Sequence, residues 1–144
     1  RGARSVHVLP FTDQAGYDTL LWASDLNFVR GEDSFVRAQW AAQPFVWQIY
    51  PQAEAAHHDK LEAFLARYLA RLPGADAEAL GAFWRVWNAC ADTPATAADA
   101  WPALRSALPA LAAHARAWSD ALAAQPDLAS RLSRFCSHIE SGPG

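Results

Sequence analysis

The sequence predicts an α/β fold in which an incomplete, Rossmann-like parallel sheet is followed by a layer of helices. Three observations support this fold class. The 144 residues are the size of one domain, and 52% of them are hydrophobic, which is enough for a core. Up to about residue 55, short β-type runs alternate with helical runs. Beyond that point every segment has helical spacing.

Three runs have the composition of strands. "SVHVLP" (5–10) is rich in β-branched residues and ends at a proline, so we expect a buried strand. "DLNFV" (25–29) is a short apolar run, and "PFVWQIY" (44–50) is apolar at nearly every position. Near-continuous apolar strands are typical of a parallel sheet that is covered on both faces. Because open sheets usually have about five or six strands, we expect further strands to precede residue 1.

Two helices are expected between these strands. "TDQAGYDTLLWAS" (12–24) begins with Thr12 as a candidate N-cap and has apolar residues at helical spacing. "DSFVRAQWAA" (33–42) fits a helix that is buried on one side. Residues 1–55 are therefore predicted to form a βαβαβ unit.

Residues 56–144 are predicted to be a helical portion of the same domain. Apolar stripes and terminating proline or glycine residues place its helices at 57–72, 76–90, 98–124 and 126–139. Four tryptophans occur at packing spacing in these helices and are expected in the core: Trp84, Trp87, Trp101 and Trp118. Three others flank the turn at residues 27–36 and are expected to support it structurally: Trp22, Trp40 and Trp47.

Charge and cysteine usage exclude several classes of protein. The net charge is −3 and the basic residues are scattered, so no broad basic face for nucleic acid is expected. Apolar runs are broken by charge too soon for a membrane span. Cys90 and Cys136 lack CxxC spacing, which favours buried free thiols in a reducing compartment such as the cytoplasm. The chain opens on Arg1 and has no methionine, so we expect a fragment of a longer protein.

The turn "NFVRGEDSFV" (27–36) is the candidate functional site. It lies where a strand is followed by a helix, and doubly wound sheets bind their ligands at such positions. Free N–H groups and the helix dipole attract phosphate there. Gly31 can adopt a positive φ or let a ligand approach the backbone closely. Ser34 can donate from its hydroxyl and N–H, and Arg30 offers a fork of donors for oxygen anions.

The two acids in this turn, Glu32 and Asp33, have two explanations. Acids in the first turn of a helix stabilise it by ~0.3–1 kcal/mol, and Asp33 alone could fill that role. Alternatively, an acid can accept hydrogen bonds from the hydroxyls of a sugar that is attached to the phosphate. Donors for a diphosphate beside an acceptor for a sugar would suit a nucleotide-sugar.

Other candidate sites are weaker. His57 and His58 are adjacent on a predicted helix, so their side chains diverge by about 100° and do not chelate a metal well together. No Asp-x-Asp pair occurs, and no metal is expected. Ser34 lacks a G-x-S-x-G elbow, which argues against hydrolase chemistry.

The segment "YDTLLWASDLNFVRGEDSFVRAQWAAQPFVWQIYPQ" (17–52) resembles the signature of the bacterial elongation factor P arginine rhamnosyltransferases. The run "DLNFVRGEDSFVRAQW" is specific to that family, and "FVWQIYPQ" and "HHDKLEAFL" continue the likeness until about residue 75. The resemblance implies the C-terminal, donor-binding half of an inverting GT-B glycosyltransferase, an enzyme without a metal cofactor. It also implies transfer of rhamnose from dTDP-β-L-rhamnose to an arginine of elongation factor P.

The same resemblance implies two sets of donor-binding residues. The set that contacts the diphosphate and rhamnose is Arg30, Glu32, Asp33 and Ser34. The set that helps form the nucleotide pocket is Phe11, Gln14 and Tyr50. Glu32 is implied to be important to activity, whereas the aspartate base and the acceptor-recognition surface of the family lie in an N-terminal half that is absent here. Ser24 occupies a position that is often cysteine in the family, a small change.

Three functional classes follow. The first is the donor-binding half of a rhamnosyltransferase, inactive by itself. The second is a non-catalytic nucleotide-sugar-binding module. The third is a helical protein-interaction domain that would use the helices at 98–139 as its surface.

Overall fold

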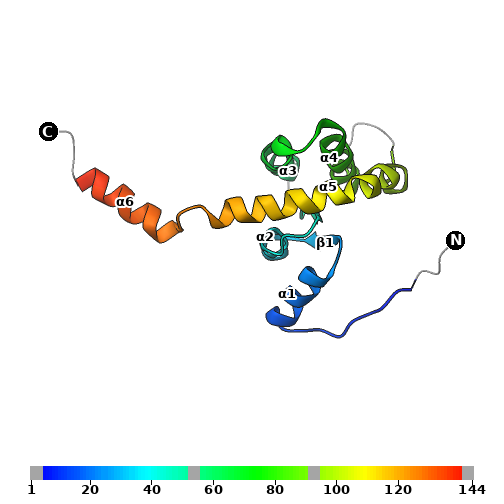
Figure 1. Cartoon of the computed structure of the whole chain (residues 1–144), viewed down its shortest axis with the longest axis horizontal. Coiled ribbons are helices and arrows are strands. Elements are labelled where there is room, and N and C mark those ends of the chain that lie inside the picture. Colours follow the sequence, from blue (N-terminus) through cyan, green and yellow to red (C-terminus); the bar gives the residue numbers. More distant parts are fainter. Residues whose placement is uncertain (1–4, 52–55, 91–94, 141–144) are drawn as a thin grey trace.

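The computed structural model describes residues 5–51, 56–90 and 95–140 (Figure 1). Its elements are α1 (Gln14–Ala23), β1 (Asn27–Arg30), α2 (Glu32–Trp40), β2 (Phe45–Gln48), α3 (Ala56–Tyr68), the short 3-10 helix η2 (Leu69–Arg71), α4 (Gly74–Trp87), α5 (Ala97–Ala123) and α6 (Leu128–Glu140). From residue 56 onward, the described residues contain helices and no strand. The predicted α/β class, with a small parallel sheet and many helices, is confirmed.

Strands β1 and β2 pair in parallel, with Asn27 opposite Phe45 and Arg30 opposite Gln48. They confirm the strands predicted at 25–29 and 44–50, with bounds that differ by one or two residues. Helix α2 connects the two strands and packs on both. Because parallel strands run in the same direction, the carboxyl ends of β1 and β2 lie at one edge of the sheet. The turn after β1 therefore lies at that edge.

The buried strand predicted at residues 5–10 is wrong. The segment is extended but forms no strand, and the side chains of Val6 and Val8 are 90% and 94% exposed. Strand propensity reflects how well a side chain packs on neighbouring strands, and no described strand pairs with this segment. The described part of the predicted βαβαβ unit thus contains two strands rather than three.

All six predicted helices are present, with small changes at their ends. The predicted N-cap of the first helix is wrong by one residue: Asp13, not Thr12, accepts a hydrogen bond from the N–H of Gly16 at 2.8 Å. The helix predicted at 57–72 changes its hydrogen-bond pattern after Tyr68 and ends as η2. Such tightening of a last turn is common before a proline, here Pro73.

The core is a cluster of aromatic and aliphatic side chains between the sheet, α3, α4 and α5. Trp84 is completely buried, and its indole N–H donates to the carbonyl of Phe45 at 3.2 Å. Trp87 and Trp118 pack against the cluster as predicted, whereas Trp101 lies at its exposed edge. Figure 1 shows α5 crossing the molecule between α3 and α4 on one side and α2 and β1 on the other. The long helix thus joins the two parts of the fold.

A buried asparagine connects α4 to the sheet. The Oδ1 atom of Asn88 accepts from the N–H of Ile49 at 2.9 Å, and its Nδ2 atom donates to the carbonyl of Trp47 at 2.8 Å. These are the backbone groups at the end of β2 that a strand partner would otherwise satisfy. Asn88 therefore positions the carboxyl end of β2, next to the candidate site.

Helix α6 lies beyond the end of α5, away from the rest of the fold (Figure 1). Its apolar side chains Leu128, Leu132 and Phe135 are exposed. Cys136 is exposed on the same helix and Cys90 is half-buried, so both thiols are free but the prediction that both are buried is wrong. Within the described ranges, no helix is both long enough and apolar enough to cross a membrane.

Candidate functional site

The turn between β1 and α2 is built around Gly31. This residue has φ +78° and is the N-cap of α2, and it provides no side-chain hydrogen bond to the first turn. A Cβ atom at this position would lie 2.7 Å from Cε2 of Tyr50, so only glycine fits. The N–H of Gly31 donates to the carbonyl of Gln48 at 3.2 Å, and its carbonyl accepts from Nε1 of Trp47 at 2.8 Å. The start of α2 is thus fixed and uncapped, as an anion site requires.

Arg30 and Tyr50 form a pair at this turn. The guanidinium carbon of Arg30 lies 4.9 Å from the centroid of the Tyr50 ring, a cation–π contact. Both side chains are exposed, and within the part of the chain that the structure describes Arg30 has no carboxylate partner. The contact holds a guanidinium with free donors beside the first turn of α2. Two residues that the resemblance assigned to different sets, diphosphate and nucleotide, are therefore neighbours.

Asp33 is paired with Arg37, which was not among the predicted site residues. Nε of Arg37 donates to Oδ2 of Asp33 at 3.0 Å, and Nη1 of Arg37 donates to both carboxylate oxygens of Asp18 at 2.9 Å. Hydrogen bonds to Asp18 and then to Asp33 raise the pKa of Arg37 above its usual value. Arg37 therefore joins α1 to α2 and offsets the negative charge of Asp33 at the turn. The i,i+4 spacing of Asp33 and Arg37 was the available sequence signal.

Glu32 and Ser34 remain available for a ligand. Glu32 is exposed at the first position of α2 and has no hydrogen bond or ion pair to the described residues. Ser34, the third residue of α2, is half-buried and lines a cavity. Arg37 occupies one carboxylate oxygen of Asp33, whereas both carboxylate oxygens of Glu32 are without a partner among the described residues.

An open cavity of about 390 Å³ lies between the segment before α1, α1 itself and the start of α2. Its lining includes Phe11, Gln14, Asp33, Ser34 and Arg37. This volume is within the range of small-molecule sites, about 300–1,000 Å³. The structure therefore places Phe11 and Gln14, which are far from the turn in sequence, next to Asp33 and Ser34.

The predicted site residues form two adjoining groups rather than one. Arg30 and Tyr50 lie at the turn itself, and Phe11 and Gln14 line the cavity with Asp33 and Ser34. Glu32 is part of the turn but does not line the cavity. The first turn of α2 connects the two groups. Of the three supporting tryptophans, Trp47 is buried behind Gly31 as predicted, but Trp22 and Trp40 are 59% and 52% exposed and do not support the site.

Within the described ranges, no group of three or more histidine, cysteine, aspartate or glutamate side chains is arranged to hold a metal ion. His57 and His58 lie side by side at the start of α3, with ring centroids 4.3 Å apart. The polar groups of the candidate site are instead a guanidinium, a hydroxyl, backbone N–H groups and carboxylates.

These features define an α/β protein with an uncapped helix start at the carboxyl end of a parallel strand, next to an open cavity. The family model described as elongation factor P (EF-P) rhamnosyltransferase EarP matches residues 1–137. The chain belongs to this family.

Known relatives are similar along most of this chain. It is 55% identical over 136 residues to a protein-arginine rhamnosyltransferase of Pseudomonas putida and 52% identical over 135 residues to one of Pseudomonas aeruginosa. Each match covers 94% of this chain and 35% of the relative, so the chain spans about a third of the length of these relatives. A solved structure concerned with EarP-mediated arginine glycosylation of translation elongation factor EF-P superimposes with a TM-score of 0.73 and 47% identity. That match covers 89% of this chain and 39% of the other.

Proposed function

We propose that this chain is the donor-binding part of a protein-arginine rhamnosyltransferase with a GT-B fold. The complete enzyme would transfer rhamnose from dTDP-β-L-rhamnose to an arginine of elongation factor P, with inversion, in the cytoplasm. The single observation that supports this role best is the uncapped first turn of α2, with Gly31, Arg30 and Ser34 around it, beside a cavity of about 390 Å³. Family membership and the relatives' names agree with this proposal.

The donor would be bound by both groups of the site. The diphosphate would accept hydrogen bonds from the N–H groups of the first turn of α2, from Ser34 and from the guanidinium of Arg30. Glu32 would accept hydrogen bonds from the rhamnose hydroxyls, because its carboxylate is free while Asp33 is paired with Arg37. Phe11, Gln14 and Tyr50 would contact the nucleoside part of the donor.

The chemistry of arginine glycosylation explains why the donor-binding part would need the N-terminal half of the enzyme. A guanidinium has a pKa above about 12 and is a poor nucleophile while it is protonated. A carboxylate must orient it and take a proton as the bond to the sugar forms. We propose that this base lies in the N-terminal half of the complete enzyme. The described residues would stabilise the leaving dTDP, using Arg30, Ser34 and backbone N–H groups in place of a metal ion.

The test uses the complete enzyme, dTDP-β-L-rhamnose and elongation factor P. Calorimetry measures donor binding, and mass spectrometry of elongation factor P measures arginine modification. We expect Glu32→Ala to lower the modification rate by about two orders of magnitude, the loss typical when one transition-state contact is removed. Glu78→Ala, at an exposed acid of α4, is the matched control and should change the rate by less than about twofold.

Two results would contradict the proposal in different ways. If dTDP-β-L-rhamnose does not bind the complete enzyme, the proposed substrate is wrong. If the donor binds but Glu32→Ala modifies elongation factor P as fast as the wild type, the role of Glu32 is wrong and the rest of the proposal stands.

A further inference from the structure

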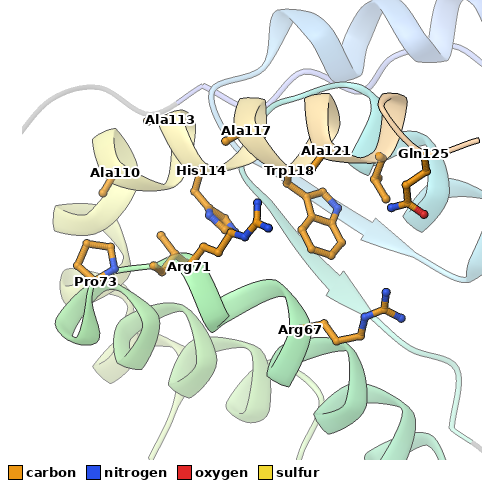
Figure 2. Close-up of a pocket in the computed structure, with 12 residues that line it drawn as sticks. Arg67, Arg71, Pro73, Ala110, Ala113, His114, Ala117, Trp118, Ala121 and Gln125 are labelled. Atoms are coloured by element: carbon orange, nitrogen blue, oxygen red, sulfur yellow. The ribbon is translucent and has the colours of Figure 1, made fainter.

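A second cavity, larger than the first, lies between α3, η2 and the C-terminal half of α5. Its volume is about 720 Å³, and it shares no lining residue with the cavity at the start of α2. Figure 2 shows side chains from η2 and α5 converging on it, with Arg71 next to His114 and with Trp118 and Arg67 further along. The volume is again that of a small-molecule site.

His114 contributes a buried polar atom without a partner. Its side chain belongs to a residue that is only 8% exposed, it lines the cavity, and its Nε2 atom has no hydrogen-bond partner within the described ranges. Two contacts with Tyr68 fix the position of the ring. It forms a hydrogen bond with the backbone of Tyr68, and it packs edge-on against the Tyr68 ring with a centroid distance of 4.7 Å. Buried polar atoms are nearly always paired, so a free Nε2 at a cavity indicates a missing partner.

The ring of His114 is an acceptor at neutral pH. Burial is the main reason that its pKa is lowered, and the nearby charge of Arg71 lowers it further. The charged and titratable groups that act on it are Arg71 from η2 and Tyr68 from α3, whose own pKa is raised by burial. A neutral imidazole that donates through one nitrogen accepts through the other. The partner that Nε2 lacks is therefore a donor.

The cavity is also positively charged. The guanidinium groups of Arg67 and Arg71 line it, and none of the described acidic residues does. Neither arginine has an ion pair in the part of the chain that the structure describes, in contrast to Arg37 and Arg85. Each unpaired guanidinium group at the cavity offers donors to a carboxylate or phosphate group.

The rest of the lining is apolar. Pro73 lies on one side, the alanine face of α5 with the ring of Trp118 lies on the other, and Leu72 also lines the cavity. The indole N–H of Trp118 donates to Oε1 of Gln39 at 3.0 Å, so this ring is held in place. Apolar walls around a few polar groups are the usual composition of a site for an organic ligand.

We propose that this cavity binds a small organic acid with an apolar, preferably aromatic, body and a hydroxyl or N–H donor. The guanidinium groups of Arg67 and Arg71 attract its acidic group, its body lies against Trp118 and the alanine face of α5, and its donor reaches Nε2 of His114. The site is separate from the proposed donor site and does not depend on the proposed function.

The test titrates the complete protein that contains these residues with 6-hydroxy-2-naphthoate and follows the His114 imidazole and the Trp118 indole by ¹⁵N NMR. We expect saturable shifts of both signals. 2-Naphthol, which lacks the acid, and 2-naphthoate, which lacks the hydroxyl, should each bind at least about tenfold more weakly, the effect of one lost polar contact in a buried site. 2-Naphthyl phosphate distinguishes a preference for phosphate from one for carboxylate.

Arg71→Gln should weaken binding of 6-hydroxy-2-naphthoate by about tenfold or more. Arg116→Gln removes the same charge from an exposed position of α5 outside the cavity and should change the affinity by less than about twofold. Arg67→Gln provides an independent second variant with the same expectation as Arg71→Gln.

The absence of saturable shifts would overturn the proposed site. Equal binding to the wild type, Arg71→Gln and Arg67→Gln would overturn the anion-binding role of the cavity. Equal affinity for 2-naphthoate and its hydroxylated form would overturn the role of His114. Binding of dTDP-β-L-rhamnose is measured on the same samples. A protein that binds dTDP-β-L-rhamnose but not 6-hydroxy-2-naphthoate would contradict the second site and leave the proposed function intact.

Discussion

The indole N–H of Trp47 donates to the carbonyl oxygen of Gly31 over 2.8 Å, from β2 to the turn after β1. Trp47 is buried, and its ring stacks on Phe35 with a centroid distance of 4.0 Å. The hydrogen bond orients the peptide that precedes α2. The orientation of this peptide determines where the first N–H groups of α2 point. The buried side chain of Trp47 therefore positions the proposed anion site.

Trp47→Phe should destabilise the protein by about 1–3 kcal/mol, because the carbonyl of Gly31 loses its buried donor. The phenyl ring can still stack on Phe35, but it is smaller than the buried indole, so the cavity that it leaves adds to the loss. Urea unfolding followed by circular dichroism measures the change. Trp22→Phe, at an exposed tryptophan, is the control and should stay within about 0.5 kcal/mol of the wild type. A value for Trp47→Phe inside that range would show that the hydrogen bond does not hold the turn.

Gly31→Ala should destabilise the protein by more than about 1–2 kcal/mol. The residue has φ +78°, which costs a non-glycine residue about that much, and the new Cβ would lie 2.7 Å from the Tyr50 ring. Because Tyr50 would have to move, its contact with Arg30 should also be lost. We therefore expect weaker binding of dTDP in addition to the lower free energy of unfolding.

The matched control for this variant is Gly74→Ala. A Cβ at position 74 meets nothing within 4 Å, and the residue begins α4. That substitution should be neutral or should stabilise the protein by about 0.4–1 kcal/mol, since alanine restricts the unfolded chain. If both variants lose the same stability, the strain at Gly31 is not the cause.

Arg37→Gln should weaken dTDP binding although Arg37 is not one of the proposed donor contacts. The substitution removes the contacts to Asp18 and Asp33 and so frees α1 from α2. Phe11 and Gln14 precede or begin α1, and their position relative to Ser34 depends on that connection. Arg37→Gln also leaves the negative charge of Asp33 unmatched beside the proposed diphosphate site.

Asp18→Asn and Asp33→Asn separate these two effects in the calorimetric measurement. Asp18→Asn disturbs the connection between α1 and α2, whereas Asp33→Asn leaves that connection intact and removes a negative charge from the turn. Weaker binding in the first variant and a smaller loss in the second would confirm both roles. Unchanged affinity in Arg37→Gln would show that α1 is held in place by other contacts.

The turn at residues 30–34 could be predicted because its determinants are local. A glycine, a serine and two acids between a strand and a helix specify a positive φ and a polar first turn wherever the rest of the chain lies. The Asp33–Arg37 pair was readable from its spacing for the same reason. The contact of Arg37 with Asp18 was not, because it joins residues on different helices and depends on how these helices pack.

Residues 5–10 show the opposite case. Their β-branched composition indicates a strand, but a strand exists only where another strand pairs with it. The exposure of Val6 and Val8 shows that none of the described strands does so. The position of Phe11 beside Ser34 likewise depends on tertiary packing, and only the family resemblance suggested it.

The stability of the protein should fall as the pH is lowered through about 6.5, the ordinary pKa of histidine, because of His114. Burial lowers the pKa of His114 in the folded protein, so the unfolded chain binds the proton more readily. Protonation of His114 then favours unfolding. The free energy of unfolding begins to fall below the pKa of histidine in the unfolded chain, and it stops falling below the pKa of His114 in the folded protein. Tyr68, which packs on this ring, stays neutral over that range because burial raises its pKa. His114→Gln should flatten the free energy of unfolding between about pH 7 and pH 5, measured by urea denaturation at several pH values, relative to His7→Gln at an exposed position. An identical pH slope in the wild type and His114→Gln would show that another group controls the acid sensitivity.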